Sequence, residues 1–490
     1  MQTFSPTTTQ STGSQRSAST ISGPMKLVGI VVRVGGLLFG YDQGVISGAL
    51  HGIKAQFGLS SLLIEVVTSW VTLGALFGAL AGGELADRLG RKKTILIAGA
   101  AFVFGALIQS LALGTALLVG GRFVIGLGVG IAAVAAPLYG AEMAPTEMRG
   151  RFVSFYQLAI TMGIFLAYLV DGALANGDAW RLMLGVAAVP GVLLIGVMLA
   201  APESPRWLVK MGRRDEALTI IRRVSPSLDH SRFLDSIEAA LREEAHAASW
   251  SEVFTAAWRK PLLVAVGLAV FQQVTGINAI IYYADRIFAA AGFTTPASQT
   301  LATTWAIGGV NVLATFIAIA FIDRLGRRPL LLAGLVGMGV SLAIVGIAFH
   351  AIDAAPMASG LQVAGIVTLI ALVAFIISFA FSLGPVVWTV INEIFPGRVR
   401  GRAVAVATAV NWGAAFLVSE FFLTLIDAIG PSFTFWLFGL LCGVCWVWVY
   451  CRVPETKDRS LEEIEEIWVH QDVVSHTRAP MGQPSTARRF

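Results

Sequence analysis

The sequence has few charged side chains for its length. Only 13% of its 490 residues are Asp, Glu, Lys or Arg, whereas 56% are hydrophobic, and the mean hydropathy is +0.75. A soluble domain needs a largely polar surface, so this composition excludes a soluble protein for most of the chain. It predicts a polytopic membrane protein.

Cysteines and nucleotide-binding motifs are also scarce. Cys442, Cys445 and Cys451 share one apolar run with no histidine nearby, so we expect packing side chains and neither a disulfide framework nor a metal site. No lysine follows a glycine, which excludes a Gly-Lys-Ser/Thr phosphate loop and ATP hydrolysis on this chain. The glycine-rich stretch 126–130 lies inside an apolar run and is interpreted as close helix packing. We expect a transporter with no cofactor, not an enzyme.

Apolar runs of roughly 20 residues, the length of a helix that crosses a bilayer, follow one another along the chain. They lie at about 27–50, 62–86, 94–112, 115–138, 152–174, 181–201, 261–285, 298–322, 329–351, 362–390, 402–427 and 431–452. A polar segment divides these twelve runs into two groups of six. The sequence predicts an all-α membrane protein with an N-terminal bundle at 27–201, a cytoplasmic helical domain at 202–260 and a C-terminal bundle at 261–452.

Lys and Arg are unevenly distributed among the loops. They concentrate between spans 2 and 3, 4 and 5, 8 and 9, and 10 and 11, whereas the loops on the other side carry only Lys54, Arg181 and Arg286. The positive-inside rule then predicts that both termini are cytoplasmic, and the net charge of +5 reads as a topology signal rather than nucleic-acid binding. Residues 1–26 are expected to form a disordered tail and 453–490 a C-terminal helix and tail.

Charged motifs at the predicted cytoplasmic helix ends occur twice, once in each half. The matching residues are Asp87, Arg88 and Arg91 with Asp323 and Arg324; Glu142 and Arg149 with Glu393 and Arg400; and Glu203 with Glu455. Repeated halves are typical of transporters whose site lies between them near the midplane, so the duplication predicts transport. We expect the charges to form ion pairs that hold the halves together in one conformation. The alternative is anchoring of helix ends by snorkelling charges.

Two ionisable residues lie inside predicted spans at matching depth. Asp42 is about eight residues, and Arg122 about seven, from the outer ends of their spans, which places both roughly 10–12 Å below the surface at 1.5 Å per residue. Charges at such depth usually face the bundle interior with a partner, so we expect a pair. A conformational change that separates or joins them could release or load a proton; the alternative is a static salt bridge.

Six motifs in order carry a resemblance to a known family. They are FGYDQGVISGAL from Phe39, DRLGRKK from Asp87, PESPRWL from Pro202, FQQVTGINAIIYYA from Phe271, DRLGRRP from Asp323 and VPETKDRSLEEIE from Val453. With this topology, the chain resembles the sugar porter family of the major facilitator superfamily over about residues 27–467. The resemblance implies twelve helices in two bundles that move a monosaccharide by alternating access.

The resemblance also implies which residues bind the sugar. A sugar needs amides that donate and accept hydrogen bonds, and aromatic faces for its apolar surface. The family's positions carry over as Gln157, Gln272, Gln273, Asn278, Asn311, Trp388, Asn411 and Trp412, with Phe39 and Tyr283 as further candidates that could instead simply pack. Gln272, Gln273 and Asn278 do not share one face of an ideal helix, so we expect local unwinding near Gly276.

Two further features complete the prediction. Pro385 breaks a backbone hydrogen-bond ladder, so Trp388 could close over the substrate as a gate.

Proton-coupled relatives carry Asp at the position of Asp42, where passive relatives commonly carry Asn. The sequence thus predicts a monomeric hexose or pentose symporter in the cell membrane, whose partners are sugar, proton and the lipid bilayer. The alternatives are a passive uniporter, a cyclic polyol or inositol transporter, and a transporter-like sugar sensor.

Overall fold

The computed structural model describes residues 23–144, 149–175, 179–224, 229–245, 250–354, 360–395 and 397–457. These ranges are almost entirely helical and contain no strand. Most of the expected N-terminal tail, and residues 458–490 of the expected C-terminal helix and tail, lie outside them.

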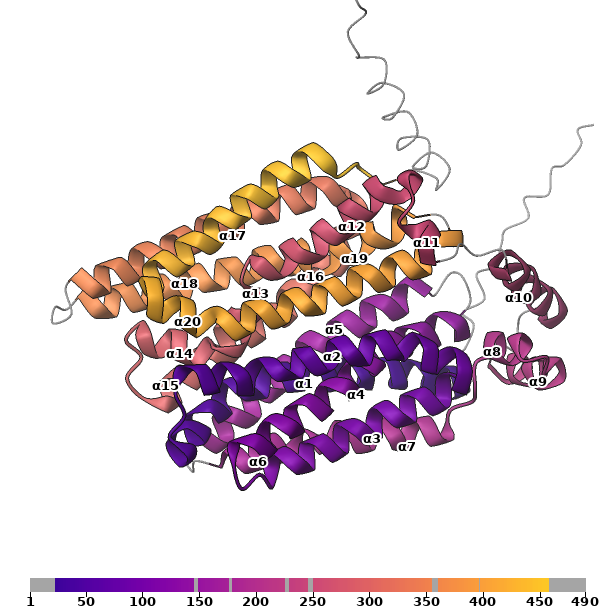
Figure 1. The fold of residues 1–490 in the computed structure, drawn as a ribbon, viewed down its shortest axis with the longest axis horizontal. Coiled ribbons are helices and arrows are strands. Elements are labelled where there is room, and N and C mark those ends of the chain that lie inside the picture. The colour runs from indigo at the N-terminus through magenta and orange to yellow at the C-terminus, as the bar shows by residue number, and fades with distance from the viewer. Residues whose placement is uncertain are drawn as a thin grey trace, which may run out of the picture.

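The helices form two bundles that lie side by side (Figure 1). The N-terminal half consists of α1 (Gly23–Phe57), α2 (Ser61–Leu89), α3 (Arg91–Ser110), α4 (Thr115–Met143), α5 (Arg149–Leu174), α6 (Trp180–Val186) and α7 (Ala188–Ala200). The C-terminal half consists of α12 (Ala256–Val274), α13 (Ile277–Tyr282), α14 (Ala284–Ala290), α15 (Pro296–Ala302), the π-helix η3 (Thr303–Gly309), α16 (Val310–Leu325), α17 (Arg327–Ala354), α18 (Gly360–Phe381), α19 (Leu383–Glu393) and α20 (Gly397–Arg452). The predicted two-bundle architecture is confirmed.

Several predicted spans are built from more than one helix. Eleven continuous helical stretches among the described residues are long and apolar enough to cross a membrane. The last of them, α20, contains Gly430 with a non-helical φ of 80°, followed by Pro431, which cannot donate a backbone hydrogen bond. Each side of this kink is long enough to cross, which accounts for the predicted runs at 402–427 and 431–452.

A smaller helical domain lies at one end of the two bundles. It comprises α8 (Pro205–Lys210), α9 (Arg214–Val224) and α10 (His230–Ala245), whereas α11 (Trp250–Val253) packs against α12 and α20 of the C-terminal half (Figure 1). Trp207 of α8 donates from Nε1 to the Asp87 carbonyl oxygen at 2.9 Å, and Lys210 Nζ lies 3.0 Å from Asp87 Oδ2. These contacts join the domain to the end of α2.

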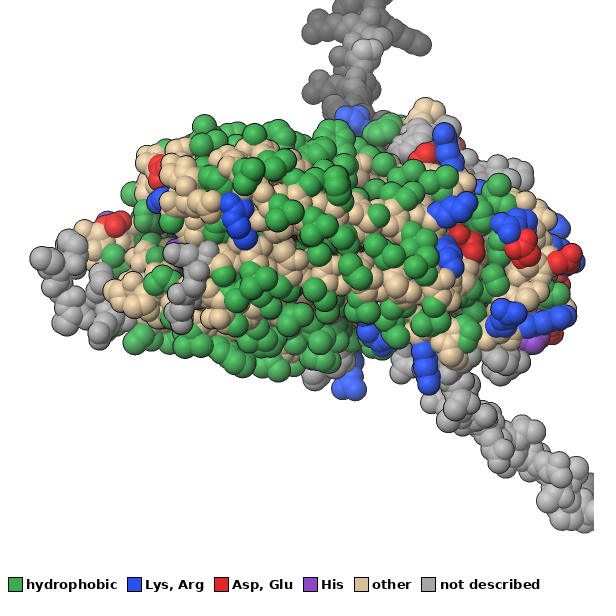
Figure 2. Space-filling model, turned by 90° about the horizontal axis from the view of Figure 1, so that it is seen from below, with side chains coloured by type: hydrophobic (Ala, Val, Ile, Leu, Met, Phe, Trp, Pro, Cys, Tyr) green, Lys and Arg blue, Asp and Glu red, His purple; other side chains and the backbone are tan. Residues whose placement is uncertain are grey.

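Charge and hydrophobicity divide the surface along the length of the molecule. Apolar side chains cover its middle, and blue and red side chains gather at the end that carries α8–α10 (Figure 2). We call this the basic end and the opposite end, with α6 and α15, the α15 end. Leu440 is 64% exposed and Phe104 is 62% exposed, an arrangement that favours lipid rather than water around the middle.

Glycines set the spacing of helices in the N-terminal half. A Cβ atom on Gly126 would lie 2.1 Å from the Val71 carbonyl oxygen, and one on Gly130 would lie 2.2 Å from the Ala75 carbonyl oxygen. Any side chain there would push α2 away from α4. The interpretation of the stretch 126–130 as close helix packing is confirmed.

Candidate functional site

The buried charges Asp42 and Arg122 meet inside the N-terminal half. Arg122 Nη1 lies 2.7 Å from Asp42 Oδ1, and the side chains are 0% and 2% exposed, respectively. The guanidinium also donates to the carbonyl oxygens of Val67 at 3.2 Å and Thr68 at 3.4 Å, which ties α4 to α2. The structure thus brings the two residues together, as their depths predicted. Whether they carry a proton stays a prediction.

The helix after α12 is interrupted where the sequence predicted unwinding. α12 ends at Val274, and Gly276 has a φ of 93° and a ψ of 8°, a left-handed conformation that glycine adopts without strain. Because the chain changes direction here, Gln272 and Gln273 before the break can approach Asn278 after it. Asn278 Nδ2 donates to Gln273 Oε1 at 2.7 Å.

These three amides form a network with α20. Asn411 Nδ2 donates to Gln272 Oε1 at 2.8 Å, and Gln273 Nε2 donates to Asn411 Oδ1 at 3.3 Å. All four side chains are buried. Each amide carries donors and an acceptor, so the network can exchange its internal bonds for bonds to a ligand that both donates and accepts.

Gln43 and Tyr282 were missed by the sequence reasoning. Gln43 Nε2, on α1, donates to Asn278 Oδ1 at 3.3 Å and to the Tyr282 hydroxyl at 3.5 Å. These bonds cross between the two halves. Gln43 directly follows Asp42, and its position inside the FGYDQG motif was the available signal.

The other predicted sugar-binding positions differ in their contacts. Phe39 and Trp412, from opposite halves, have ring centroids 5.3 Å apart. The Asn311 side chain is buried and makes no hydrogen bond with the described residues. Gln157 and Trp388 are half-buried, and their side chains likewise make none.

Tyr283 does not join the network. Its hydroxyl donates to the Ser419 carbonyl oxygen at 3.0 Å, and its ring stacks on Phe422 with centroids 5.1 Å apart. Both partners belong to α20, so Tyr283 packs the C-terminal half in this conformation.

The predicted break near Pro385 is present. α18 ends at Phe381, Ser382 has non-helical dihedral angles, and α19 begins at Leu383. Gln272 Nε2 donates to the Leu383 carbonyl oxygen at 2.8 Å, so the break is joined directly to the amide network. Gating by Trp388 stays a prediction.

At the basic end, the duplicated motifs form duplicated contacts. Arg91 lies 2.7 Å from Glu142, whose other oxygen accepts from Ser204 at 2.6 Å. In the C-terminal half, Arg327 lies 3.0 Å from Glu393, which also accepts from Thr456. Each set lies within its own half. Holding the halves together in another conformation therefore stays a prediction.

Glu203 and Glu455 occupy equivalent places at the starts of α3 and α17. Glu203 accepts from the backbone N–H groups of Arg91 and Lys92, and Glu455 from those of Arg327 and Arg328. A carboxylate there satisfies amides that have no partner within the helix. Burial raises the pKa of Glu203 despite these bonds. Burial acts in the same direction on Glu455, but its backbone hydrogen bonds outweigh it and lower the pKa.

The remaining predicted charges have local partners where they are described. Arg88 pairs with Glu84 at 2.5 Å, and Asp87 lies 3.3 Å from Arg91. Arg400 donates to the Phe395 carbonyl oxygen at 3.0 Å. Arg324 lies exposed at the end of α16. The side chains of Arg149 and Asp323 lie outside the described residues.

Comparison with known proteins identifies the family. The family model described as "Sugar (and other) transporter" matches residues 28–468. The chain is 36% identical to the arabinose-proton symporter of Bacillus subtilis, covering 90% of this chain and 95% of that protein. It is 39% identical to the glucose transporter GlcP of Staphylococcus epidermidis, covering 90% and 96%. It is also 39% identical to the galactose-proton symporter of Escherichia coli K12, covering 88% and 91%.

Solved structures agree with the sequence relatives. The partially occluded inward-open xylose transporter XylE of E. coli superimposes with a TM-score of 0.78 at 29% identity, covering 90% of this chain and all of that one. The proton:xylose symporter XylE bound to 6-bromo-6-deoxy-D-glucose gives a TM-score of 0.74 at 30% identity, covering 91% and 99%. The chain belongs to the sugar porter family of the major facilitator superfamily.

Proposed function

We propose that this protein carries a monosaccharide, a hexose or a pentose, together with a proton into the cell by alternating access. The observation that carries the proposal is the adjacency of Asp42 and Gln43 on α1. Asp42 binds Arg122 within the N-terminal half, while Gln43 hydrogen-bonds Asn278 in the other half. A shift of α1 that separates the ion pair therefore also changes the contact with the amide network.

Sugar recognition rests on the chemistry of that network. A monosaccharide presents hydroxyl groups that both donate and accept, which suits the amides of Gln272, Gln273 and Asn411. The Asn311 amide adds hydrogen-bonding groups with no partner among the described residues. Phe39 and Trp412 supply aromatic surface for the apolar face of a sugar ring. The names of the relatives include arabinose, galactose and glucose, which supports this substrate class.

Proton coupling rests on the burial of the Asp42–Arg122 pair. Separation of these charges in a dry interior is costly, so a conformation that separates them favours protonation of Asp42. We place the basic end in the cytoplasm, with both termini, because Lys and Arg concentrate there. We further propose that one chain is sufficient for transport, because the amide network and the ion pair both come from a single chain.

Uptake into proteoliposomes tests the proposal. A panel of labelled hexoses, pentoses and cyclic polyols is offered with and without an inward proton gradient, while external pH is recorded. We expect one monosaccharide to accumulate above equilibrium and alkalinise the medium. Equilibration without proton movement would identify a uniporter, and binding without flux a sensor; preference for a polyol would overturn the substrate class.

A further inference from the structure

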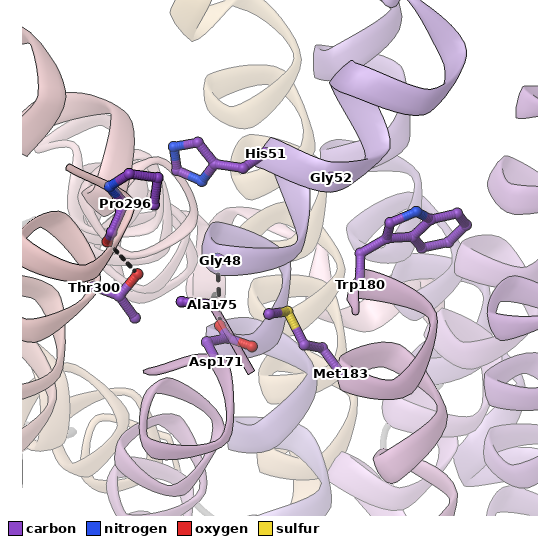
Figure 3. A pocket seen from close by; sticks show the side chains of 9 residues that line it. All are labelled: Gly48, His51, Gly52, Asp171, Ala175, Trp180, Met183, Pro296 and Thr300. Carbon is purple, nitrogen blue, oxygen red and sulfur yellow. Dashed lines mark hydrogen bonds between the residues drawn. The ribbon is translucent and has the colours of Figure 1, made fainter. Parts of the chain in front are cut away.

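A small cavity lies between the two halves at the α15 end, away from the amide network. Gly48 and His51 of α1, Asp171 of α5 and Thr300 of α15 line it, with Trp180 of α6 on one side (Figure 3). No lysine or arginine is among its lining residues. The cavity therefore combines a carboxylate and an imidazole without a fixed positive charge.

Asp171 is incompletely satisfied in this cavity. Its side chain is 1% exposed. One carboxylate oxygen, Oδ2, accepts from the Gly48 backbone N–H at 3.3 Å, as the dashed line in Figure 3 shows. The other, Oδ1, is buried without a hydrogen-bond partner. A buried carboxylate with a free oxygen is costly when ionised, and a bound proton would remove the charge.

A second buried carboxylate, Asp285 of α14, belongs to the opposite half. It is 0% exposed and accepts from the hydroxyls of Thr300 at 3.0 Å and Thr303 at 2.5 Å. Its backbone N–H donates to Ser47 Oγ of α1 at 3.1 Å, which fixes it against the N-terminal half. Thr300 thus connects Asp285 to the cavity that Asp171 lines.

His51 is the one basic side chain that faces these carboxylates from the elements described around them. Its Nδ1 lies 4.0 Å from Asp285 Oδ2, and its side chain is 35% exposed. The nearby phenols are committed elsewhere, because Tyr41 donates to the Met183 carbonyl oxygen at 3.1 Å and Tyr168 to that of Ile281 at 2.9 Å. The cluster therefore closes with two carboxylates and at most one positive charge.

We propose that His51, Asp171 and Asp285 form a second proton-binding site, separate from the Asp42–Arg122 pair, that takes up a proton when the two halves close at the α15 end. Closure removes both carboxylates from water, and their mutual repulsion is strong in a low-dielectric contact. A proton that enters from the water beside His51 offsets one of these charges. It returns to the same side when the end reopens, so this site sets the balance of conformations without adding to net proton transport.

The proposal rests on the proposed alternation of the two halves but not on sugar transport. Distances between spin labels at the α15 end test it directly. Labels are placed at Leu113→Cys, in the 89% exposed loop position of the N-terminal half, and at Thr294→Cys, an exposed position of the C-terminal half. The background carries Cys451→Ser, which removes an exposed thiol, and Asp42→Asn, which removes the other titrating site.

The labelled protein is measured in nanodiscs from pH 5 to pH 8.5 without sugar and without a gradient. We expect the ratio of closed to open conformations to rise as pH falls, by up to about tenfold per pH unit for one linked proton. The Asp171→Asn/Asp285→Asn variant should lose this pH dependence. Asp427→Asn, an exposed carboxylate of α20 outside the cluster, is the matched control and should keep it.

The proposal would be overturned if the label distances in the Asp171→Asn/Asp285→Asn variant changed with pH as they do in the parent. It would also be overturned if the label distances in the parent did not change with pH. Closure that follows sodium concentration, when choline replaces sodium at fixed pH, would overturn the assignment of the ligand as a proton. Should the double variant fail to fold, His51→Gln serves instead. The pH range of its closure should differ from the parent's, because the basic group 4.0 Å from Asp285 Oδ2 is removed, whereas Asp427→Asn should leave that range unchanged. Failure of sugar accumulation alone would refute the proposed function and leave this result standing.

Discussion

The two halves of the molecule share their basic-end motifs but differ in the middle of the membrane. In the N-terminal half, α1 is a continuous helix that carries a charged residue, Asp42, paired with Arg122 of α4. In the C-terminal half, the chain is broken at Gly276 and again at Ser382, and amide side chains form the buried network beside the first break. The comparison indicates a division of labour, with a buried ion pair on continuous helices in one half and an amide network on interrupted helices in the other.

The largest expected effect comes from removing the charge of the N-terminal half. Asp42→Asn should abolish accumulation of sugar above equilibrium, because an amide cannot bind and release a proton at this position. Exchange of internal for external sugar should continue, because the amide network is intact. Parallel measurements of uphill uptake and of counterflow check this, and undiminished uphill uptake would place the coupling elsewhere.

The second test removes an amide from the C-terminal half. Asn411→Ala removes the 2.8 Å donor to Gln272 Oε1 and the acceptor of Gln273 Nε2. We therefore expect sugar affinity to fall by about 10- to 100-fold, equivalent to about 1–3 kcal/mol for unsatisfied buried groups. Sugar binding is measured by quenching of intrinsic tryptophan fluorescence. Gln109→Ala is the matched control, since Gln109 is a fully buried amide of the N-terminal half that donates to the Leu184 carbonyl oxygen. It should keep the affinity, and an equal loss in both variants would contradict a localised site.

The break at Gly276 offers a third test. Gly276→Ala should destabilise the C-terminal half, because an alanine at a φ of 93° costs about 1–2 kcal/mol, and its Cβ would lie 2.7 Å from Phe438. We expect a thermal midpoint lower by several degrees and weaker sugar binding. The matched control Gly83→Ala lies in a helix with open space around the new Cβ, and it should leave both unchanged. Sugar affinity that survives Gly276→Ala would show that the left-handed turn does not position the amides.

The smallest expected effect is a difference in thermal midpoint between variants of the equivalent residues Glu203 and Glu455. The pKa of Glu455 is lowered in the folded protein, so the ionised side chain stabilises the fold. This stabilisation is fully present at a pH above the ordinary pKa of 4.5, and it is lost as the pH falls through the lowered pKa. The pKa of Glu203 is raised, so its protonated side chain stabilises the fold at a pH below the ordinary pKa of 4.5. This stabilisation is lost as the pH rises through the raised pKa. At pH 7, Glu455→Gln should lower the thermal midpoint by about 1 °C per kcal/mol lost, because the shift becomes smaller as the chain becomes longer.

Glu203→Gln should have little effect on that midpoint at pH 7, or raise it, because it removes a charge that burial disfavours. Thermal unfolding in detergent at pH 7 and pH 5 checks both variants. Equal losses at pH 7 would show that the two caps contribute alike and that the repeat is energetically symmetrical.

The lengths of the apolar runs predicted the spanning helices, because a bilayer requires a fixed length of apolar helix. The same reasoning anticipated the break at Gly276, since three amides on different faces could meet only if the helix unwound. It missed Gln43, because the partner of an amide across two halves depends on how those halves dock rather than on local pattern. It also missed Asp171 and Asp285, which carry no recognised motif and acquire their significance from burial where the two halves meet.

The glycine contact between α2 and α4 has a consequence for changing the sugar preference of this protein. Backbone meets backbone at Gly126 and Gly130, so neither helix can accept a larger residue there or slide past the other. Random mutagenesis of this contact should yield mostly misassembled protein. A selection for new substrates should therefore find its productive variants around the interrupted helices of the opposite half. Libraries confined to that half should contain a larger fraction of variants that assemble and transport.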